Sequence, residues 1–282
     1  MIHFTANELE QYISEDLPYL DLTTHLQGIE NTKVSLEVFT REDIIVSCMQ
    51  EACAMVKMLN CDVNFYIKSK QKAHKNDVIL QFSGEYNDVH KAWRSAQVIL
   101  EYSCKIATYA YNMKQEILKV NQHCELLTTR KTFPFSKKFC IKSILTGGAM
   151  PHRLNLSETI LFFPHHRIVY KNDQEFYQMI QNFKIKTPEK KVVVESDKLQ
   201  DAKQLMRYGA DVLQMDKVNT TILEQIVGYK NTHYPTVKIL AAGGIGLHNA
   251  QEYAKTGIDG IVTSKVYMAG MADLGTKMKL LV

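Results

Sequence analysis

Long apolar runs are missing from this sequence. No stretch approaches the roughly 20 consecutive apolar residues that span a bilayer, which excludes a helical membrane protein. The first residues, Met1 to Thr5, show no basic region followed by an apolar stretch, so we expect no secretory signal and a cytoplasmic location. Low-complexity tracts and sequence repeats are also missing. With 45% hydrophobic and 23% charged residues, the composition excludes disordered, collagen-like and coiled-coil classes.

A strong excess of one charge is missing as well. Thirty-four Lys and Arg residues stand against thirty Asp and Glu residues, a formal net charge of +4. A nucleic-acid-binding protein is expected to be more basic, so no nucleic-acid partner is predicted. This balance is compatible with a local cationic pocket for a small anionic substrate.

Cysteine pairs of the C-x-x-C type are absent, so no zinc framework is indicated. Most of the cysteines lie within apolar helical or strand patterns. In a cytoplasmic protein such residues are expected to be reduced and buried rather than joined in disulfides. The six are Cys48, Cys53, Cys61, Cys104, Cys124 and Cys140.

The chain of 282 residues is too long for one ordinary compact domain and suits an α/β barrel or a two-domain enzyme. Its first hundred residues show the pattern of a small α+β unit. A long helical stretch from Val89 towards Val120, with a candidate break near Ser103, ends this part. Earlier helices are predicted at 7–13 and 51–60, and strands at 33–39, 63–67 and 78–82.

From about Cys124 the pattern changes to short apolar runs that alternate with helices. Such runs are typical of parallel strands buried on both faces, as in a parallel sheet or an α/β barrel. Six strands fall short of the usual eight, so an open barrel is predicted. We place an N-terminal domain at 1–107, joined by the tail 268–282, and the barrel at 108–267. The strands are predicted at 125–129, 159–163, 192–195, 211–215, 237–241 and 260–263, with helices at 199–208, 220–229 and 249–255.

The residues that follow the predicted barrel strands form a chemically coherent set. The active site of a parallel barrel lies at the carboxyl ends of its strands. Cations, two carboxylates and a glycine pair at this rim indicate a polyanionic substrate held with a divalent metal. The set comprises Arg130, Lys131, His152, Arg153, Glu195, Asp216, Lys217, Ala242, Gly243, Gly244, Ile245, Ser264 and Lys265.

Each of these features also has a structural explanation. Gly243-Gly244 leaves backbone N–H groups free for a phosphate, but glycine pairs also serve ordinary strand–helix turns. Glu195 and Asp216 suit Mg²⁺ or ribose hydroxyls, or else cap a loop or form a surface ion pair. Arginines such as Arg130 and Arg153 offer paired donors to carboxylates and phosphates, or pair within the protein.

Several spaced motifs together resemble one enzyme family. Thr129-Arg130-Lys131-Thr132-Phe133-Pro134, followed by Gly147-Gly148 and His152-Arg153-Leu154, is similar to the signature of quinolinate phosphoribosyltransferases. These enzymes are also called nicotinate-nucleotide pyrophosphorylases (carboxylating). The resemblance covers nearly the whole chain. It continues through Glu15-Asp16-Leu17, Asp21-Leu22-Thr23-Thr24, Glu195, Asp216 and Gly243-Gly244-Ile245.

The resemblance implies a fold, an assembly and a set of roles. The fold is an α/β sandwich-like N-terminal domain with an open, six- to seven-stranded α/β barrel. The assembly is a dimer or a hexamer of dimers, in which Arg94 reaches the neighbour's active site. The substrates are small molecules, phosphoribosyl pyrophosphate and an acceptor, used with Mg²⁺. The residues that match binders of the carboxylates and phosphates are Arg130, Lys131, His152 and Arg153. The match to the acidic pair that holds the ribose hydroxyls and Mg²⁺ is formed by Glu195 and Asp216. The 5′-phosphate loop is matched by Gly243 and Gly244.

Departures from the family pattern concern the acceptor. Phe163 stands where the family usually has a lysine, which removes a charge-assisted contact to a dianionic acid. With these changes the chain resembles the ModD branch, pyrophosphorylases associated with molybdate-transport operons. We therefore predict an acceptor other than quinolinate, with a true quinolinate enzyme of NAD biosynthesis as the alternative. The other replacements are Phe135 for glycine, Pro151 for asparagine, Ala242 for serine and Ser264 for glycine.

The implied reaction is transfer of ribose 5-phosphate to a ring nitrogen with loss of pyrophosphate, catalysed by Arg130, Lys131, Glu195 and Asp216.

Two other functions fit parts of the sequence. A lyase or aldolase would use a Schiff-base lysine at a strand end, and a non-catalytic barrel would sense a nucleotide or oxyanion. His165-His166 has no third ligand at a recognisable spacing and is interpreted as a loop pair rather than a metal site. The Schiff-base candidates are Lys131, Lys217 and Lys265.

Overall fold

The computed structural model describes residues 2–281, which divide into two compact units. The first unit contains the described parts of Met1–Tyr111, Phe133–Gly148 and Tyr267–Val282, and the second contains Asn112–Thr132 and Ala149–Val266. The chain therefore passes between the units four times. The domain boundary that we place at residue 107 stays a prediction, and it did not include the return of 133–148 to the first unit.

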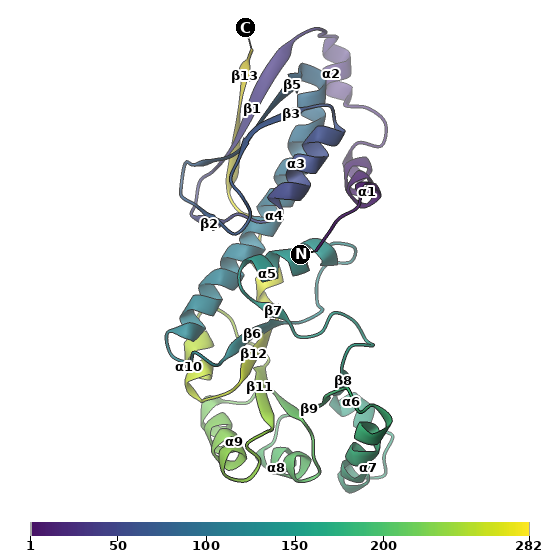
Figure 1. Ribbon diagram of the computed structural model, residues 1–282, viewed down its shortest axis with the longest axis vertical. Coiled ribbons are helices and arrows are strands. Elements are labelled where there is room, and N and C mark those ends of the chain that lie inside the picture. Colours follow the sequence, from purple (N-terminus) through teal and green to yellow (C-terminus); the bar gives the residue numbers. More distant parts are fainter. Residues whose placement is uncertain (1, 282) are drawn as a thin grey trace. The chain divides into compact units, whose positions relative to one another are not determined.

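The first unit is built on a four-stranded antiparallel sheet in the order β13-β1-β5-β3. Its central strand, β1, alternates side chains so that Val34, Leu36 and Val38 are buried in the core. Helix α3 and the first part of α4 pack on this core (Figure 1). The bounds are β1 Lys33–Thr40, β3 Asp62–Tyr66, β5 Val78–Glu85, β13 Leu274–Leu280, α3 Met49–Met58 and α4 Tyr86–Leu118, with a separate short pair of β2 Ile44–Ile45 and β4 Lys72–Ala73.

Three further helices complete the first unit: α1 (Ala6–Asp16), α2 (Leu22–Gln27) and α5 (Lys137–Thr146). A reciprocal cap begins α1, because the Thr5 side chain accepts from the Glu8 N–H while the Glu8 side chain accepts from the Thr5 N–H. Helix α5 is fastened by an ion pair of 2.5 Å between Lys142 Nζ and Glu51 Oε1, with both side chains 7% exposed. Removing one partner of such a pair would leave a buried, uncompensated charge.

Helix α4 runs without interruption from Tyr86 to Leu118, so the predicted break near Ser103 is wrong. Ser103 and Cys104 lie on the buried face of the helix. Small buried residues of this kind let the helix pack closely on its neighbours. Packing of this face stabilises the helix and outweighs the low helix propensity of serine.

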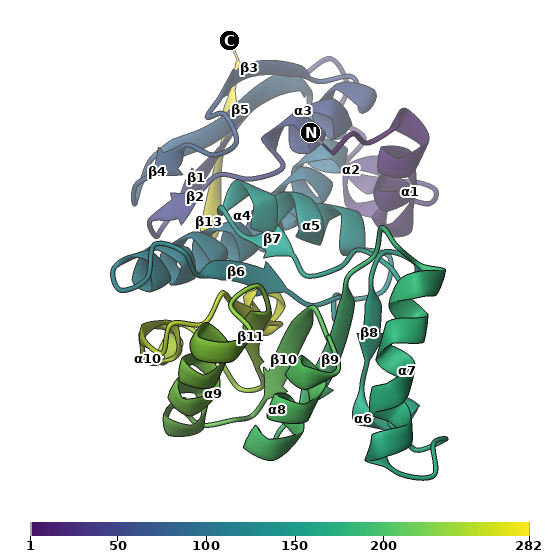
Figure 2. The ribbon, with the colours of Figure 1, turned by 60° about the horizontal axis from the view of Figure 1, so that its bottom comes forward.

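The second unit contains a seven-stranded parallel sheet in the order β7-β6-β12-β11-β10-β9-β8. Helices α7, α8, α9 and α10 cover its outer side (Figure 2). Strands β7 and β8 are the two edges of this sheet, so the barrel is open, as the sequence predicted. The strands are β6 Glu125–Thr128, β7 Met150–Pro151, β8 Ile160–Phe162, β9 Val192–Ser196, β10 Val212–Asp216, β11 Lys238–Ala242 and β12 Gly260–Thr263, and the helices are α6 Pro164–Arg167, α7 Asp173–Lys186, α8 Leu199–Arg207, α9 Thr220–His233, α10 Ala250–Lys255 and the 3₁₀ turn η1 Lys265–Met268.

Two further findings concern the chain as a whole. Within residues 2–281, no helix combines the length and the apolar character that a bilayer crossing requires. All six cysteines are free and buried, which confirms the sequence-based expectation of buried thiols.

Candidate active site

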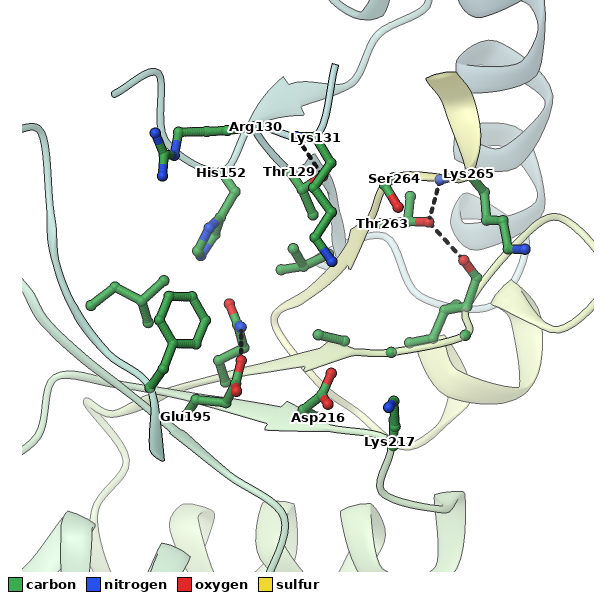
Figure 3. A pocket seen from close by; sticks show the side chains of 18 of the residues that line it. Thr129, Arg130, Lys131, His152, Glu195, Asp216, Lys217, Thr263, Ser264 and Lys265 are labelled. Atoms are coloured by element: carbon green, nitrogen blue, oxygen red, sulfur yellow. Dashed lines mark hydrogen bonds between the residues drawn. The ribbon is translucent and has the colours of Figure 1, made fainter. Parts of the chain in front are cut away.

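A cavity of about 430 Å³ opens at the carboxyl ends of the parallel strands. Each of the seven strands, or the residues directly after it, contributes to the lining. Figure 3 shows the side chains of Lys131 and His152 on one side of this space, with Glu195 and Asp216 facing them from the other. The cavity thus brings together cations and carboxylates from strands that are far apart in the sequence.

Hydrogen bonds of Thr129 and Thr263 fix the segments that carry Lys131 and Lys265. The Thr129 N–H donates to the Thr263 carbonyl oxygen at 3.0 Å, which holds the start of the Arg130-Lys131 segment against β12. Thr263 Oγ1 in turn donates to the Ile245 carbonyl oxygen at 2.7 Å and accepts from the Lys265 N–H at 3.1 Å (Figure 3). The loops after β6, β11 and β12 are therefore tied together beside the cavity.

The turn after β11 requires glycine. Gly243 and Gly244 have φ angles of 87° and 77°, in the left-handed region that favours glycine. A Cβ atom on Gly243 would lie 2.7 Å from Asp216 Oδ1 and 2.8 Å from the Lys217 backbone nitrogen. The Lys217 N–H donates to the Ala242 carbonyl oxygen at 2.8 Å, so this turn lies directly against the Asp216 loop.

The two carboxylates come from neighbouring strands. Glu195 lies on β9 opposite Gln214 of β10, and Asp216 ends β10. Gln214 Nε2 donates to Glu195 Oε2 at 2.6 Å. Burial raises the pKa of Glu195, the nearby charge of Asp216 adds to this, and the hydrogen bond from Gln214 opposes it. A cation placed between these carboxylates would favour their ionised forms.

His152 and Arg153 follow β7. The His152 N–H donates to the Thr128 carbonyl oxygen at 2.9 Å. Burial, helped by the charge of Arg153, lowers the pKa of His152 to about 4, so its ring is neutral at pH 7. Arg153 is 9% exposed, and burial together with the charge of Arg130 lowers its pKa.

Phe163, directly after β8, presents an aromatic ring to the cavity. The guanidinium carbon of Arg153 lies 5.8 Å from the ring centroid, within the range of a cation–π contact. The ring of His166 stacks on Phe163 at a centroid distance of 5.7 Å. His166 Nδ1 also accepts a hydrogen bond of 2.9 Å from the Phe163 N–H, so His166 has a structural role at the start of α6.

The lowered pKa of His152 predicts how the stability of the folded protein depends on pH. Its folded-state pKa of about 4 lies below the ordinary 6.5, so the unfolded chain takes up the proton more readily. The contribution of the neutral His152 ring to the free energy of unfolding is therefore complete above pH 6.5 and is lost as the pH falls towards 4. When the pH is lowered from 7.5 to 4.5, the free energy of unfolding of the wild type should fall by about 2 kcal/mol more than that of His152→Gln. Urea denaturation at both pH values measures this. Equal losses in the two proteins would contradict it.

All the predicted site residues except Arg94 line the barrel cavity. Their catalytic and binding roles stay predictions. Arg94 lies on α4 in the first unit, where it lines a separate cavity of about 440 Å³ with Tyr12, Glu15 and Asp16. The residues that meet in the barrel cavity are Arg130, Lys131, His152, Arg153, Phe163, Glu195, Asp216, Ala242, Gly243, Gly244 and Ser264.

Sequence reasoning missed Gln214 and Thr263, which also line the cavity. For Gln214 a signal was available, because it is the only uncharged polar residue in the run Val212–Asp216. The Schiff-base candidates Lys131, Lys217 and Lys265 lie here too. All three share the cavity with carboxylates and the glycine turn, a setting that suits phosphate binding.

Two carboxylates are available for a divalent metal. Across residues 2–281, no cluster of three or more His, Cys, Asp and Glu side chains is placed to hold a metal by itself. Mg²⁺ is commonly bound by one or two carboxylates together with substrate phosphates and waters. Glu195 and Asp216 fit that arrangement, since they face the same space as the turn of Gly243 and Gly244.

Solved structures of known enzymes share this fold along the whole chain. The nicotinate-nucleotide pyrophosphorylase of Francisella tularensis matches with a TM-score of 0.87, at 21% identity, over 99% of this chain and 98% of that one. NadC from Streptococcus pyogenes matches with a TM-score of 0.89, at 18% identity, over 100% of both chains. The fold is therefore that of these two proteins.

Family models identify the group more closely. The N-terminal domain model of quinolinate phosphoribosyl transferase matches residues 21–104, and the C-terminal domain model matches residues 106–277. The chain belongs to the quinolinate phosphoribosyl transferase family. It is a phosphoribosyltransferase, as the sequence motifs predicted.

Relatives within the family carry two kinds of name. A ModD protein of Pasteurella multocida, named as a pyrophosphorylase, is 29% identical over 97% of each chain. A ModD protein of Escherichia coli O157:H7 is 28% identical over 99% of this chain and 98% of its own. The nicotinate-nucleotide pyrophosphorylase (carboxylating) of Dictyostelium discoideum is 24% identical over 96% of this chain and 94% of its own. The predicted similarity to the ModD branch is confirmed.

Proposed function

We propose that this enzyme transfers ribose 5-phosphate from phosphoribosyl pyrophosphate to a ring nitrogen of an acceptor other than quinolinate. In this reaction the bond from the ring nitrogen to C1′ forms and the bond from C1′ to pyrophosphate breaks, with the electron pair leaving on pyrophosphate. One observation carries the proposal. The residues that the resemblance assigns to the phosphoribosyl group share one cavity with Phe163, an uncharged aromatic residue at the position where the resemblance implies that the family usually has a lysine.

The residues on the cationic side are suited to the phosphates. Lys131 faces the cavity, and its charge together with that of Arg130 would stabilise the departing pyrophosphate. The left-handed conformations of Gly243 and Gly244 allow a phosphate to approach the backbone without meeting a Cβ atom. This turn is where we place the 5′-phosphate.

The residues on the anionic side are suited to the ribose. Glu195 and Asp216 would accept hydrogen bonds from the ribose hydroxyls and stabilise the positive charge that develops at C1′. No protein nucleophile is needed, because the ring nitrogen attacks C1′. The same carboxylates would hold Mg²⁺ together with substrate oxygens. When bound, the metal supplies positive charge close to the leaving pyrophosphate.

Pyrophosphate release from phosphoribosyl pyrophosphate tests this proposal. The purified protein is given Mg²⁺ and a panel of aromatic acids and bases, with EDTA as the metal-free control. We expect release to depend on both Mg²⁺ and an acceptor, to be lost in Lys131→Met, and to persist in Lys186→Met, which changes an exposed lysine on α7. Binding of phosphoribosyl pyrophosphate without turnover on any acceptor would favour the sensor alternative.

We also propose that the active site is shared between two copies of the chain. Arg94 belongs to the first unit, whereas the residues that line the barrel cavity all belong to the second, and the family resemblance assigns Arg94 to an active site. The first unit exposes several large apolar side chains near its N-terminus, a feature typical of protein interfaces. Tyr19 is 92% exposed, Leu22 63% and Leu26 75%.

Complementation tests the shared site. An Arg94→Ala subunit and an Arg130→Ala subunit should each be nearly inactive alone. In a two-fold dimer, one of the two sites of each hybrid has both arginines, so random mixing should restore roughly a quarter of the wild-type activity. Differently tagged subunits allow the hybrids to be isolated and assayed. Inactive hybrids would show that Arg94 serves no site in the partner.

A further inference from the structure

Gln214 is a buried polar residue in the wall of the cavity. The residue is 5% exposed, and its neighbours along β10, Leu213 and Met215, are fully buried apolar residues. It lies two residues before the strand ends at Asp216, so it is deeper in the barrel than the carboxylate at the rim. A polar group in such a position is costly unless each of its atoms finds a hydrogen-bond partner.

Only half of the Gln214 amide is satisfied. Nε2 donates to Glu195 Oε2 at 2.6 Å, whereas Oε1 is buried and has no partner. Four side-chain atoms in the described part of the chain share this condition, and Gln214 Oε1 is the one whose residue lines the barrel cavity. Because an ionised Glu195 can only accept, the NH₂ group must face it and the carbonyl oxygen must face another direction.

Two uncharged aromatic side chains line the same cavity. Phe163 follows β8, the strand next to the one that carries Glu195, and its ring offers a flat apolar surface. His152 is neutral at pH 7, as described above. A ring bound among Gln214, Phe163 and His152 would therefore meet one hydrogen-bond acceptor and two aromatic surfaces. Ribose hydroxyls have stronger acceptors nearby in Glu195 and Asp216.

We propose that Gln214 determines acceptor specificity by accepting, through Oε1, a hydrogen bond from an N–H group on the acceptor. The acceptor is then a nitrogen heterocycle that carries its own donor, an amino or ring amide group. This inference rests on the proposed phosphoribosyl transfer and names the class of its acceptor. Glu195 fixes the orientation of the amide, so the group left without a partner is the carbonyl oxygen, which is an acceptor and not a donor.

Binding of matched ring compounds tests this inference. Pyridine-3-carboxylate, its 2-, 5- and 6-amino derivatives and the corresponding dimethylamino derivatives are titrated into the full-length protein by calorimetry. The dimethylamino group keeps the ring but lacks the N–H. We expect at least one amino compound to bind the wild type about tenfold or more tightly than its dimethylamino counterpart, and this ratio to fall towards one in Gln214→Met.

Binding of phosphoribosyl pyrophosphate with Mg²⁺ is measured in the same proteins. Gln214→Met also removes the hydrogen bond to Glu195, so we expect this binding to weaken through that carboxylate, and the ratio of amino to dimethylamino binding is therefore compared within each protein. A ratio of amino to dimethylamino binding that stays as large in Gln214→Met as in the wild type would overturn the inference. Equal binding of all amino and dimethylamino pairs to the wild type would overturn it without any variant. Failure of pyrophosphate release by the wild type would instead refute the proposed reaction.

Discussion

Replacing Glu195 by Gln, or Asp216 by Asn, is expected to reduce pyrophosphate release about 100-fold or more, as removal of a charge-stabilising group typically does. Both side chains face the cavity opposite Lys131. Each amide keeps the size of the carboxylate but removes the negative charge that would stabilise the ribose cation and hold Mg²⁺. The fold should be intact, because neither carboxylate forms a salt bridge within the chain as far as residues 2–281 are described.

The pH dependence of the wild type provides a second measurement of the same role. Burial raises the pKa of Glu195 above its ordinary value, so the carboxylate becomes protonated at a higher pH than a solvent-exposed glutamate does. Activity should therefore fall on acidification at a higher pH than an ordinary glutamate would cause, and Glu195→Gln should lack that part of the pH profile. Glu224→Gln, at an exposed position on α9, is the matched control. Full turnover in both amide variants would make the carboxylate pair structural.

The second large effect concerns quinolinate, which we expect this enzyme to use poorly. Quinolinate carries two adjacent carboxylates, and each must lose its water to a site that supplies cations. Arg130 and Arg153 can meet one of them, but Phe163 offers no charge to the other. An unpaired buried carboxylate costs several kcal/mol. Sites built around charged groups discriminate strongly, so the aromatic ring should redirect the choice of acceptor.

Phe163→Lys should raise kcat/KM for quinolinate by about 10-fold or more, because it restores a charge-assisted contact. Phe163→Leu, which removes the ring without adding charge, is the control and should bring no gain. Formation of nicotinate mononucleotide from quinolinate and phosphoribosyl pyrophosphate measures both. Wild-type turnover near 1 s⁻¹ or above, with saturation below about a millimolar, would show an ordinary quinolinate enzyme.

The sequence located the barrel strands closely because they are short apolar runs, and four of them, β9 to β12, are buried along most of their length. The observed β9 and β10, Val192–Ser196 and Val212–Asp216, lie within one residue of the predicted runs, and β12 matches the predicted 260–263. Because parallel strands end at one rim, the residues after them could be brought together by pattern alone. The pattern therefore predicts that Lys131, Glu195, Asp216 and Gly243 lie near one another, and all four line the cavity.

Other features depend on contacts that no local pattern carries. Strand β7 has two residues and exists through its pairing with Leu127 and Thr128 of β6. Strand β13 lies more than 200 residues from β1 in the sequence and pairs with it antiparallel. Helix α5 returns to the first unit through the pair of Lys142 and Glu51, 91 residues apart. The half-satisfied amide of Gln214 is likewise visible only when atoms, rather than residue types, are compared.

The buried cysteines allow local unfolding of each unit to be followed by thiol labelling. Five of them belong to the first unit, whereas Cys124 alone belongs to the second. Burial raises the pKa of Cys124 and of Cys104 to about 12, so neither thiol reacts until a local fluctuation brings it into water. The rate at which a thiol reagent labels Cys124 therefore follows the opening of the barrel, and labelling of the other five follows the sheet unit. Kinetic stability can thus be resolved unit by unit in the unmodified chain.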